Sequence, residues 1–515
     1  MTTVYVPMDS SARSVGADEV ATAIEIQAAR EGVDVEVVRN GSRGMMWLEP
    51  LVEVATERGR VAYGPVTPDD VTSLFAGGFL SGGAHRLNLG LTQDIPWLAT
   101  QQRLTFSRVG VVDPLSTRDY EENGGLVALR RALQMSPEEI CDEVAASGLR
   151  GRGGAGFPTG VKWRTVLDAQ GPAKFVVCNA DEGDSGTFAD RMLMEGDPFM
   201  LIEAMAIAGI AVGANEGFIY IRSEYPDAVA TMSAAIEAAY LANWLGRGIL
   251  GSGHRFDLEI RVGAGAYICG EETAMLESLE GGRGIVRPKP PLPAVAGLFG
   301  KPTAINNVLS LASVVVVLSR GADFYRNLGV GRSRGTQIFQ LAGNVAHGGI
   351  VETAFGGTLG EMLEKYGGGT ASGRPIRAVQ VGGPLGAYLP PAQFDLVLDY
   401  EAFLDAGAML GHGGMVVFDD SADMAAQARF AMEFCATESC GRCTPCRVGA
   451  VRGVEVIDRI VAGQDPDANI ELLKELCELM TDGSLCAMGG LTPLPVRSVL
   501  KHFGGDLRRS ETTLR

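Results

Sequence analysis

The sequence predicts a multidomain α/β protein, and three observations support that fold class. The chain has 515 residues, enough for several domains, and 46% of them are hydrophobic, so large cores can form. Between residues 174 and 262, strand-like runs alternate with helical stretches, as in a mostly parallel sheet covered by helices. From about residue 421 onward the pattern is helical and contains closely spaced cysteines. We therefore expect α/β domains followed by a helical, cysteine-bearing domain.

The composition disfavours several kinds of protein. The formal net charge of −18 would repel phosphate backbones, so we expect no nucleic-acid partner. The most apolar stretches, residues 199–214 and 308–319, are too short for a membrane span. The chain opens with Met-Thr-Thr-Val-Tyr rather than a secretory signal, and its nine cysteines are an odd number, so a disulfide framework is disfavoured. These features indicate a reducing, cytoplasmic location.

Residues 1–112 form the first predicted domain, which contains no cysteine. Strand-like residues 4–6 precede a helical stretch at 17–30, and further strand-like runs follow at 33–38 and 60–63. This pattern is typical of a small α/β domain.

Residues 113–335 form a second, larger predicted α/β domain. Its first clear helix starts at a capping box, Ser136-Pro-Glu-Glu139, with proline in the first helical position, and Gly148 is its predicted C-terminal cap. The elements expected after it are a strand at 174–178, a helix at 198–214, a strand at 217–222, a helix at 226–243 and a strand at 257–262.

Two further domains complete the predicted chain. Residues 336–420 contain short strand-like runs around one predicted helix at 358–366, which indicates a β-rich module. Residues 421–515 have the pattern of helices.

The loop after the first helix of the second domain is rich in glycine. Gly151, Gly153 and Gly156 match GxGxxG, but the loop follows a helix rather than a strand, so the dinucleotide fingerprint is not satisfied. A flexible surface loop would have the same composition. However, glycines let backbone amides approach a ring or a phosphate, Phe157 offers a stacking face, and Lys162 offers a charge for phosphate. These features favour a cofactor-binding loop.

Two more loops, at residues 179–190 and 263–273, each follow a predicted strand, where α/β sheets place their ligands. Carboxylates can accept hydrogen bonds from ribityl or ribose hydroxyls, and the amide of Asn179 can both donate and accept. The alternative is that the acidic residues only cap helix N-termini. Together with the glycine loop, they predict a nucleotide-type cofactor. Cys178 and Cys269 beside these loops have no neighbouring histidine, which favours packed small side chains over nucleophiles.

Cys440, Cys443 and Cys446 form a CxxCxxC run in the helical region. Three thiolates on so tight a loop can bind one face of a [4Fe-4S] cluster, and a fourth from elsewhere can complete it. Structural zinc usually takes two separated pairs of ligands, whereas the nearest histidines, His412 and His502, show no paired spacing. The spacing therefore favours iron and sulfur over zinc.

The fourth cluster ligand is a choice between two cysteines. Cys477 follows helical spacing with apolar neighbours and has the pattern of a buried helix face. Cys486 lies just past Asp-Gly-Ser, in a turn, and is the better ligand. Cys435, five residues before the run, is interpreted as a core residue.

These motifs give the chain a family resemblance. The glycine loop at 150–163, Cys178-Asn-Ala-Asp-Glu, the loop at 263–273 and Glu438-Ser-Cys-Gly-Arg-Cys-Thr-Pro-Cys resemble the 51-kDa-type flavoprotein subunit of NADH dehydrogenases. The resemblance covers about residues 115–515. It implies a Rossmann-like FMN-binding domain at 113–335, a ubiquitin-like β-grasp domain at 336–420 and a helical [4Fe-4S] domain at 421–515.

The resemblance also implies site residues. For FMN they are Gly151, Arg152, Gly153, Lys162, Asn179, Asp181, Tyr267, Gly270, Glu271, Glu272, Asn306 and Asn307. For the nicotinamide nucleotide they are Phe157, Glu182, Asp184 and Lys289. For the cluster they are Cys440, Cys443, Cys446 and Cys486. Thr165 and Leu292 stand where many relatives have phenylalanine, and Asp184 stands where many have glutamate. A carboxylate at 184 should still repel the 2′-phosphate of NADPH.

The N-terminal region resembles the thioredoxin-like domain that carries a [2Fe-2S] cluster in relatives. The first cysteine of this chain is Cys141, so the region cannot bind that cluster through cysteine, and we expect a docking or vestigial role. A fused domain of this kind fits the diaphorase subunits of soluble NAD-linked formate dehydrogenases or NAD-reducing hydrogenases. The opening from Val4 to Ala12 is most similar to the beta subunit of molybdenum-dependent formate dehydrogenases.

The implied function is an NAD-dependent oxidoreductase subunit. Hydride would pass between NAD(H) and FMN and single electrons between FMN and the cluster, with no catalytic side chain required. The expected partners are iron–sulfur and molybdenum subunits that supply electrons from formate, or alternatively those of a hydrogenase or another NADH dehydrogenase complex. A free-standing NADH-oxidising flavoenzyme and a structural iron–sulfur module are the rival interpretations.

Overall fold

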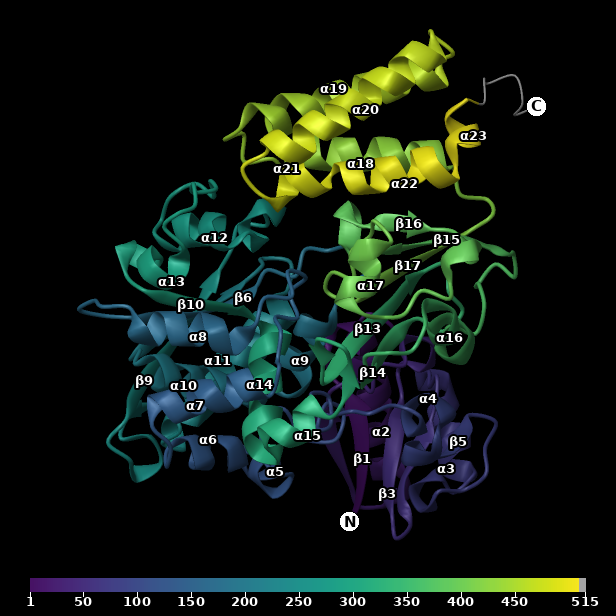
Figure 1. Cartoon of the computed structure of the whole chain (residues 1–515). Helices are drawn as coiled ribbons and strands as arrows, with labels where there is room; N and C mark the ends of the chain where they lie inside the picture. The colour runs from purple at the N-terminus through teal and green to yellow at the C-terminus, as the bar shows by residue number, and fades with distance from the viewer. Residues whose placement is uncertain (509–515) are drawn as a thin grey trace.

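Three five-stranded sheets and a group of helices follow one another along the chain (Figure 1). This computed structural model describes residues 1–508. The first sheet lies within residues 2–91, the second within 175–307 and the third within 336–419, and the C-terminal helices fill residues 424–507. The expected mixed α/β class with a helical end is therefore confirmed.

The first sheet has the order β2-β1-β3-β4-β5. Its strands are β1 (Thr2–Pro7), β2 (Val35–Asn40), β3 (Val52–Thr56), β4 (Gly59–Tyr63) and β5 (Asn88–Leu91). β1 and β2 are parallel, and the other neighbours are antiparallel. The helix α2 (Ala17–Glu31) buries Val20 and Ile24 and ends at Gly32, whose φ of 68° suits a glycine cap. The predicted helix and strands are present, and β3 and β5 are additional.

The second sheet has the order β10-β6-β7-β9-β8. Its strands are β6 (Phe175–Ala180), β7 (Glu216–Ile221), β8 (Gly246–Arg247), β9 (Arg255–Val262) and β10 (Thr303–Asn307). All neighbours are parallel except β8 and β9. The chain runs from β6 through β7 to β9 on one side and returns to β10 on the other. The carboxyl ends of β6 and β10 therefore flank a topological switch point, where such sheets bind ligands.

The helix α10 (Pro198–Val212) lies in the core beside this sheet and is buried at every position. Its sequence is apolar on all faces except for Glu203, and that carboxylate accepts hydrogen bonds from the Tyr120 hydroxyl and from the backbone N–H of Leu126 (2.9 Å) and Leu129 (2.8 Å). The buried acid thus holds the start of α6 (Val127–Ala132) against the core. The neighbouring helix α11 (Pro226–Leu241) agrees with its prediction within two residues.

The glycine loop joins α7 (Pro137–Ala146) to α8 (Thr159–Asp168). The predicted capping box at Ser136 is present, with Ser136 and Glu139 exchanging hydrogen bonds. The loop folds back on itself, because Gly151 N–H donates to the Phe157 carbonyl at 2.8 Å. Its start and its end are therefore held together beside β10 and β6.

The third sheet has the order β14-β13-β17-β15-β16. Its strands are β13 (Thr336–Gly343), β14 (Gly349–Ala354), β15 (Ile376–Val381), β16 (Ala387–Leu389) and β17 (Gly414–Asp419). The helix predicted at 358–366 divides into α16 (Leu359–Met362) and a π-helical turn (Leu363–Gly367).

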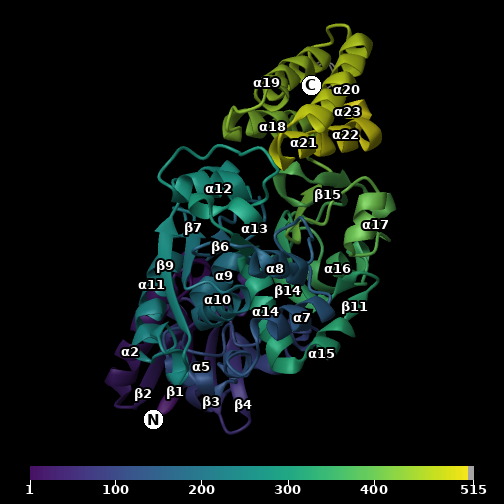
Figure 2. The ribbon, with the colours of Figure 1, turned by 60° about the vertical axis from the view of Figure 1, so that its left-hand side comes forward.

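The C-terminal helices stack at one end of the molecule, above the second and third sheets (Figures 1 and 2). They are α18 (Met424–Glu438), α19 (Thr444–Val461), α20 (Pro466–Gly483), α21 (Ala487–Leu491), α22 (Pro493–His502) and α23 (Gly504–Leu507). No helix within residues 1–508 is both long enough and apolar enough to span a bilayer.

Candidate functional site

A cavity of about 600 Å³ opens at the switch point of the second sheet, a size typical of ligand sites. It brings together fifteen of the sixteen predicted nucleotide-site residues, although they are spread over more than 150 positions of the chain. These are Gly151, Gly153, Phe157, Lys162, Asn179, Asp181, Glu182, Asp184, Tyr267, Gly270, Glu271, Glu272, Lys289, Asn306 and Asn307.

Arg152 is the exception: it does not line the cavity, and its role in holding FMN stays a prediction. The side chain is 1% exposed and turns away from the cavity to donate to the Tyr325 hydroxyl at 2.8 Å and the Arg334 carbonyl at 2.6 Å. Its backbone N–H donates to Ser310 Oγ at 2.7 Å. The guanidinium of Arg152 therefore anchors the loop, while Gly151 and Gly153 on either side of it line the cavity.

Two lysines give the acidic cavity positive charge. Lys162 Nζ donates to the Ile305 carbonyl at 2.8 Å and lies 4.0 Å from Glu272. Burial lowers the pKa of Lys162. Lys289 donates to Glu271 at 2.9 Å and to Glu272 at 2.7 Å. Lys162, with no carboxylate in direct hydrogen-bond contact, is the cation better placed to meet a phosphate.

Asp181 leaves an acceptor free for a ligand. It follows β6, and its Oδ2 is buried without a hydrogen-bond partner. Burial raises its pKa to about 7. Asn179 is fixed beside it, because its Nδ2 donates to the Gly270 carbonyl at 2.8 Å. An unpaired buried acceptor is costly unless a ligand hydroxyl pairs with it, so this edge fits the ribityl chain of FMN.

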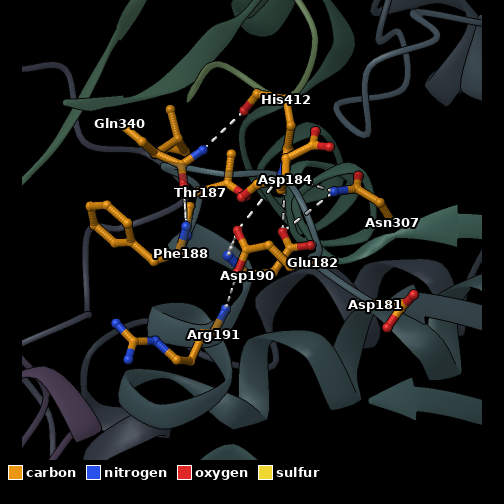
Figure 3. A network of polar contacts seen from close by, with 12 residues as sticks. Asp181, Glu182, Asp184, Thr187, Phe188, Asp190, Arg191, Asn307, Gln340 and His412 are labelled. Atoms are coloured by element: carbon orange, nitrogen blue, oxygen red, sulfur yellow. Dashed lines mark hydrogen bonds and ion pairs between the residues drawn. The ribbon is translucent and has the colours of Figure 1, made fainter. Parts of the chain in front are cut away.

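Two residues that the sequence does not predict, Asp190 and His412, also line the cavity (Figure 3). Asp190 lies in α9 (Ala189–Gly196) and is 2% exposed, and His412 precedes β17 and is 5% exposed. Burial lowers the pKa of His412, but the nearby carboxylates of Asp190, Glu182 and Asp184 outweigh burial and raise it to about 9. The histidine lies more than 200 positions from the carboxylates along the chain, so no local pattern links them.

The four predicted cluster cysteines lie in the helical end, on the side that faces the second sheet. Cys443 is the N-cap of α19 and Cys486 is the N-cap of α21, while Cys446 lies in the first turn of α19. Helix N-termini favour negative charge, which suits thiolates and an iron–sulfur cluster. The backbone N–H of Leu485 donates to Cys443 Sγ at 3.4 Å, so the Cys486 turn and the cysteine run are in contact.

The other two cysteines of this region are core residues. Cys477 in α20 is fully buried among apolar side chains, as its spacing predicts. Cys435 in α18 is also fully buried, and its Sγ lies 3.6 Å from that of Cys446. The latter contact places a fifth thiol next to the predicted ligand set.

Residues next to the predicted cluster cysteines also line the nucleotide cavity. Ala487, Met488 and Leu491, in the short helix that starts at Cys486, line the cavity. From the opposite side, Tyr267 N–H donates to Glu438, two residues before Cys440, at 2.9 Å. The arrangement defines a protein that holds a flavin nucleotide and a thiolate-bound cluster side by side.

Comparisons with known proteins agree with this arrangement. Residues 144–316 match the Nuo51 FMN-binding domain, and residues 426–510 match the iron–sulfur binding region of NADH-ubiquinone oxidoreductase-F. The chain is 47% identical to an NADH-quinone oxidoreductase subunit of Rhizobium meliloti over 399 residues, which cover 77% of this chain and 95% of that protein. It belongs to this family of 51-kDa-type flavoprotein subunits, and the resemblance seen in the sequence is confirmed.

The chain is also similar to subunits of two hydrogenases. The NADP-reducing hydrogenase subunit HndC of Solidesulfovibrio fructosivorans is 44% identical over 406 residues, 79% of this chain and 83% of that protein. The fold is also similar to a chain in the crystal structure of an NAD+-reducing [NiFe]-hydrogenase in the H2-reduced state. The superposition covers 98% of this chain and 84% of that chain, with a TM-score of 0.68 and 30% sequence identity. FMN and a [4Fe-4S] cluster are thus the cofactors of this chain. The first of these two relatives is named for reducing NADP and the second for reducing NAD+.

Proposed function

We propose that this chain transfers hydride between NAD(H) and FMN and passes single electrons between FMN and the [4Fe-4S] cluster. The observation that carries the proposal is the lining of the nucleotide cavity by Ala487, Met488 and Leu491, directly after the cluster cysteine Cys486. When bound, FMN supplies both two-electron and one-electron chemistry. The protein contributes position and electrostatics, and no side chain serves as catalytic acid or base.

The residues divide the task by chemistry. Asp181 and Asn179 hold the ribityl hydroxyls, Lys162 meets the phosphate, and Gly151, Gly153 and Gly270 leave room for the ring. The nucleotide substrate enters past Phe157, which is 51% exposed at the cavity. The cluster ligands are Cys440, Cys443, Cys446 and Cys486.

Anaerobic reduction of the purified holoprotein tests this function. NADH should bleach the flavin absorbance, and acid-labile sulfide should accompany the iron. A flavin that NADH does not bleach contradicts the hydride step, and the absence of sulfide contradicts the cluster. A flavin bleached without reduction of the cluster would favour the free-standing flavoenzyme.

Asp184 is proposed to select NADH over NADPH. Its carboxylate accepts from the Tyr267 hydroxyl at 2.7 Å at the cavity wall, where a 2′-phosphate would meet negative charge. Asp184→Asn should raise kcat/KM for NADPH by roughly tenfold, since a like charge a few ångströms away costs about 1 kcal/mol or more. Glu237→Gln, on the exposed face of α11, is the control. A ratio of NADPH to NADH activity that does not change would remove Asp184 from nucleotide selection.

We propose that the electron donor is formate, oxidised in a molybdenum partner subunit. The similarity of the N-terminal opening to formate dehydrogenase beta subunits supports this partner. A hydrogenase is the second candidate, because the [NiFe]-hydrogenase structure covers 98% of the chain and so includes the first sheet. Metal analysis of the co-purifying large subunit separates them, since molybdenum indicates the former and nickel the latter.

The proposal includes a domain scheme. The order β2-β1-β3-β4, with β1 and β2 parallel, supports a thioredoxin-like domain at 1–112. The third sheet supports a β-grasp domain at 336–420, between the FMN domain at 113–335 and the cluster domain at 421–515. The nine cysteines are all free, which is consistent with a reducing cytoplasm.

A further inference from the structure

His412 connects the third sheet to the nucleotide cavity. It follows α17 (Tyr400–Asp405) and directly precedes β17, yet its imidazole lies among residues of the second sheet (Figure 3). Its backbone carbonyl accepts from Gln340 Nε2 at 3.0 Å, and Gln340 Oε1 accepts from the backbone N–H of Phe188 and Ala189 at the start of α9. Gln340 thus fixes His412 and Asp190 relative to each other.

One nitrogen of His412 faces two partners with opposite requirements. Nε2 lies 3.2 Å from Asp190 Oδ1 and 3.1 Å from Asn307 Nδ2. The Asn307 amide orientation is set by its Oδ1, which accepts from Ser310 N–H at 3.0 Å, so Nδ2 must face the imidazole. A carboxylate needs a proton on Nε2, whereas an amide N–H needs a lone pair there. The proton on Nε2 therefore decides which partner His412 binds.

The charges around His412 favour the protonated form. Asp190 on α9 and Glu182 and Asp184 after β6 face it, and Glu182 Oε1 lies 3.7 Å from Nδ1. The nearest arginines are occupied elsewhere: Arg222 donates to the Glu182 carbonyl, and Arg191 donates to Ser10 and Ser11. His412 is thus a cation that pairs directly with the buried carboxylates of Glu182 and Asp190.

Glu182, Asp190 and His412 also have the spacing of a metal site, with ligand atoms within 4.8 Å of one another. The oxygens of Glu182 are already used, however. Oε1 accepts from Asp190 N–H at 3.0 Å, and Oε2 accepts from Arg191 N–H and the Tyr225 hydroxyl, both at 3.1 Å. Because these three hydrogen bonds occupy most of the acceptor sites of Glu182, they favour a proton on His412 over a metal ion in the cluster.

We propose that His412 is a positioning residue for the flavin: as an imidazolium paired with Asp190 at 3.2 Å and with Glu182 at 3.7 Å, it places a positive charge at the wall of the cavity that holds FMN. Loss of the proton at high pH removes this charge and lets Nε2 accept from Asn307 Nδ2, which also donates to Asp190 Oδ1 at 3.4 Å. The inference rests on the proposed FMN site, and it assigns a flavin-tuning role to a residue outside the FMN-binding domain.

The midpoint potential of bound FMN, measured anaerobically from pH 6.5 to 10, tests the proposal. His412→Gln should lower the potential at pH 7, because a positive charge stabilises the reduced anionic flavin. It should also remove the extra pH dependence that is expected of the wild type near pH 9, where His412 loses its proton. His347→Gln is the matched control, since His347 lies beside the third sheet but stacks on Trp47, away from the cavity. A wild-type potential and pH profile in His412→Gln would overturn the proposal.

A measurement on the wild type covers the case in which His412→Gln does not fold. The chain has five histidines, so 15N-histidine labelling gives a readable set of imidazole signals. One imidazole should remain protonated on both nitrogens at pH 8. If all five are neutral at that pH, the imidazolium and the proposal with it are excluded. FMN binding and NADH bleaching in the same sample test the proposed function separately.

Discussion

The two ends of this chain both pack against the FMN-binding domain, but with different chemistry. The C-terminal helices hold six of the nine cysteines, and the segment after Cys486 reaches into the cavity. The N-terminal residues 1–112 hold none and meet α9 through hydroxyl, carboxylate and guanidinium groups. Ser10 Oγ donates to Glu195 at 3.0 Å, and Arg191 donates to Ser10 and Ser11. Both ends of the chain therefore contact the FMN-binding domain, but only the C-terminal end has cysteines that can bind a redox cluster.

The largest expected effect is at the C-terminal end. Cys486→Ser should lose most of the iron and sulfide and reduce electron transfer from NADH to one-electron acceptors through the cluster to background. Cys477→Ser, in the core of α20, is the matched control and should keep its iron, since Cys477 is a packing residue. Full iron content in Cys486→Ser would mean that another thiol, with Cys435 in α18 the first candidate, completes the cluster.

A smaller effect is expected at the segment that leads out of the N-terminal region. Arg108 Nε donates to Asp197 at 2.9 Å, and its guanidinium lies 4.5 Å from the Tyr120 ring centroid. Arg108→Ala should destabilise the protein by about 3–5 kcal/mol, because it leaves a buried carboxylate unpaired. Arg118→Ala, which removes an exposed pair with Glu122, should leave the stability nearly unchanged, because solvent screens such pairs. Thermal unfolding checks both, and equal shifts of Tm would show that the Arg108 pair is not structurally important.

The smallest expected effect is a pH dependence within the N-terminal region. Burial, with the charge of Asp9, raises the pKa of Glu49 from its ordinary value of 4.5 to about 8. Because the folded pKa is the higher one, the protonated carboxyl stabilises the fold below pH 4.5, and this contribution is lost as pH rises to about 8. Glu49→Gln should therefore flatten the fall of Tm with pH in this window. The same slope in variant and wild type would show that Glu49 is ionised in the fold.

Much of the site can be predicted because its signals are local. The cysteine spacing and the clusters of glycines and acids can each be recognised from residues that are close together in the sequence. The orientation of Arg152 and the presence of His412 at the cavity depend on how distant segments meet, and sequence periodicity holds no such information. The sequence predicts a helix at 358–366, whereas the π-helical turn at its end is not evident from composition. Strands β3 and β5 escape prediction since short segments carry little pattern.

The five-residue helix α21 has a consequence for how this protein can change. Its first flanking residue, Cys486, is a proposed cluster ligand, and Met488 and Leu491 within it line the flavin cavity. A substitution there alters the surroundings of both redox groups in a single step. A substitution in α21 that is chosen to shift the potential of one cofactor should therefore also shift the potential of the other.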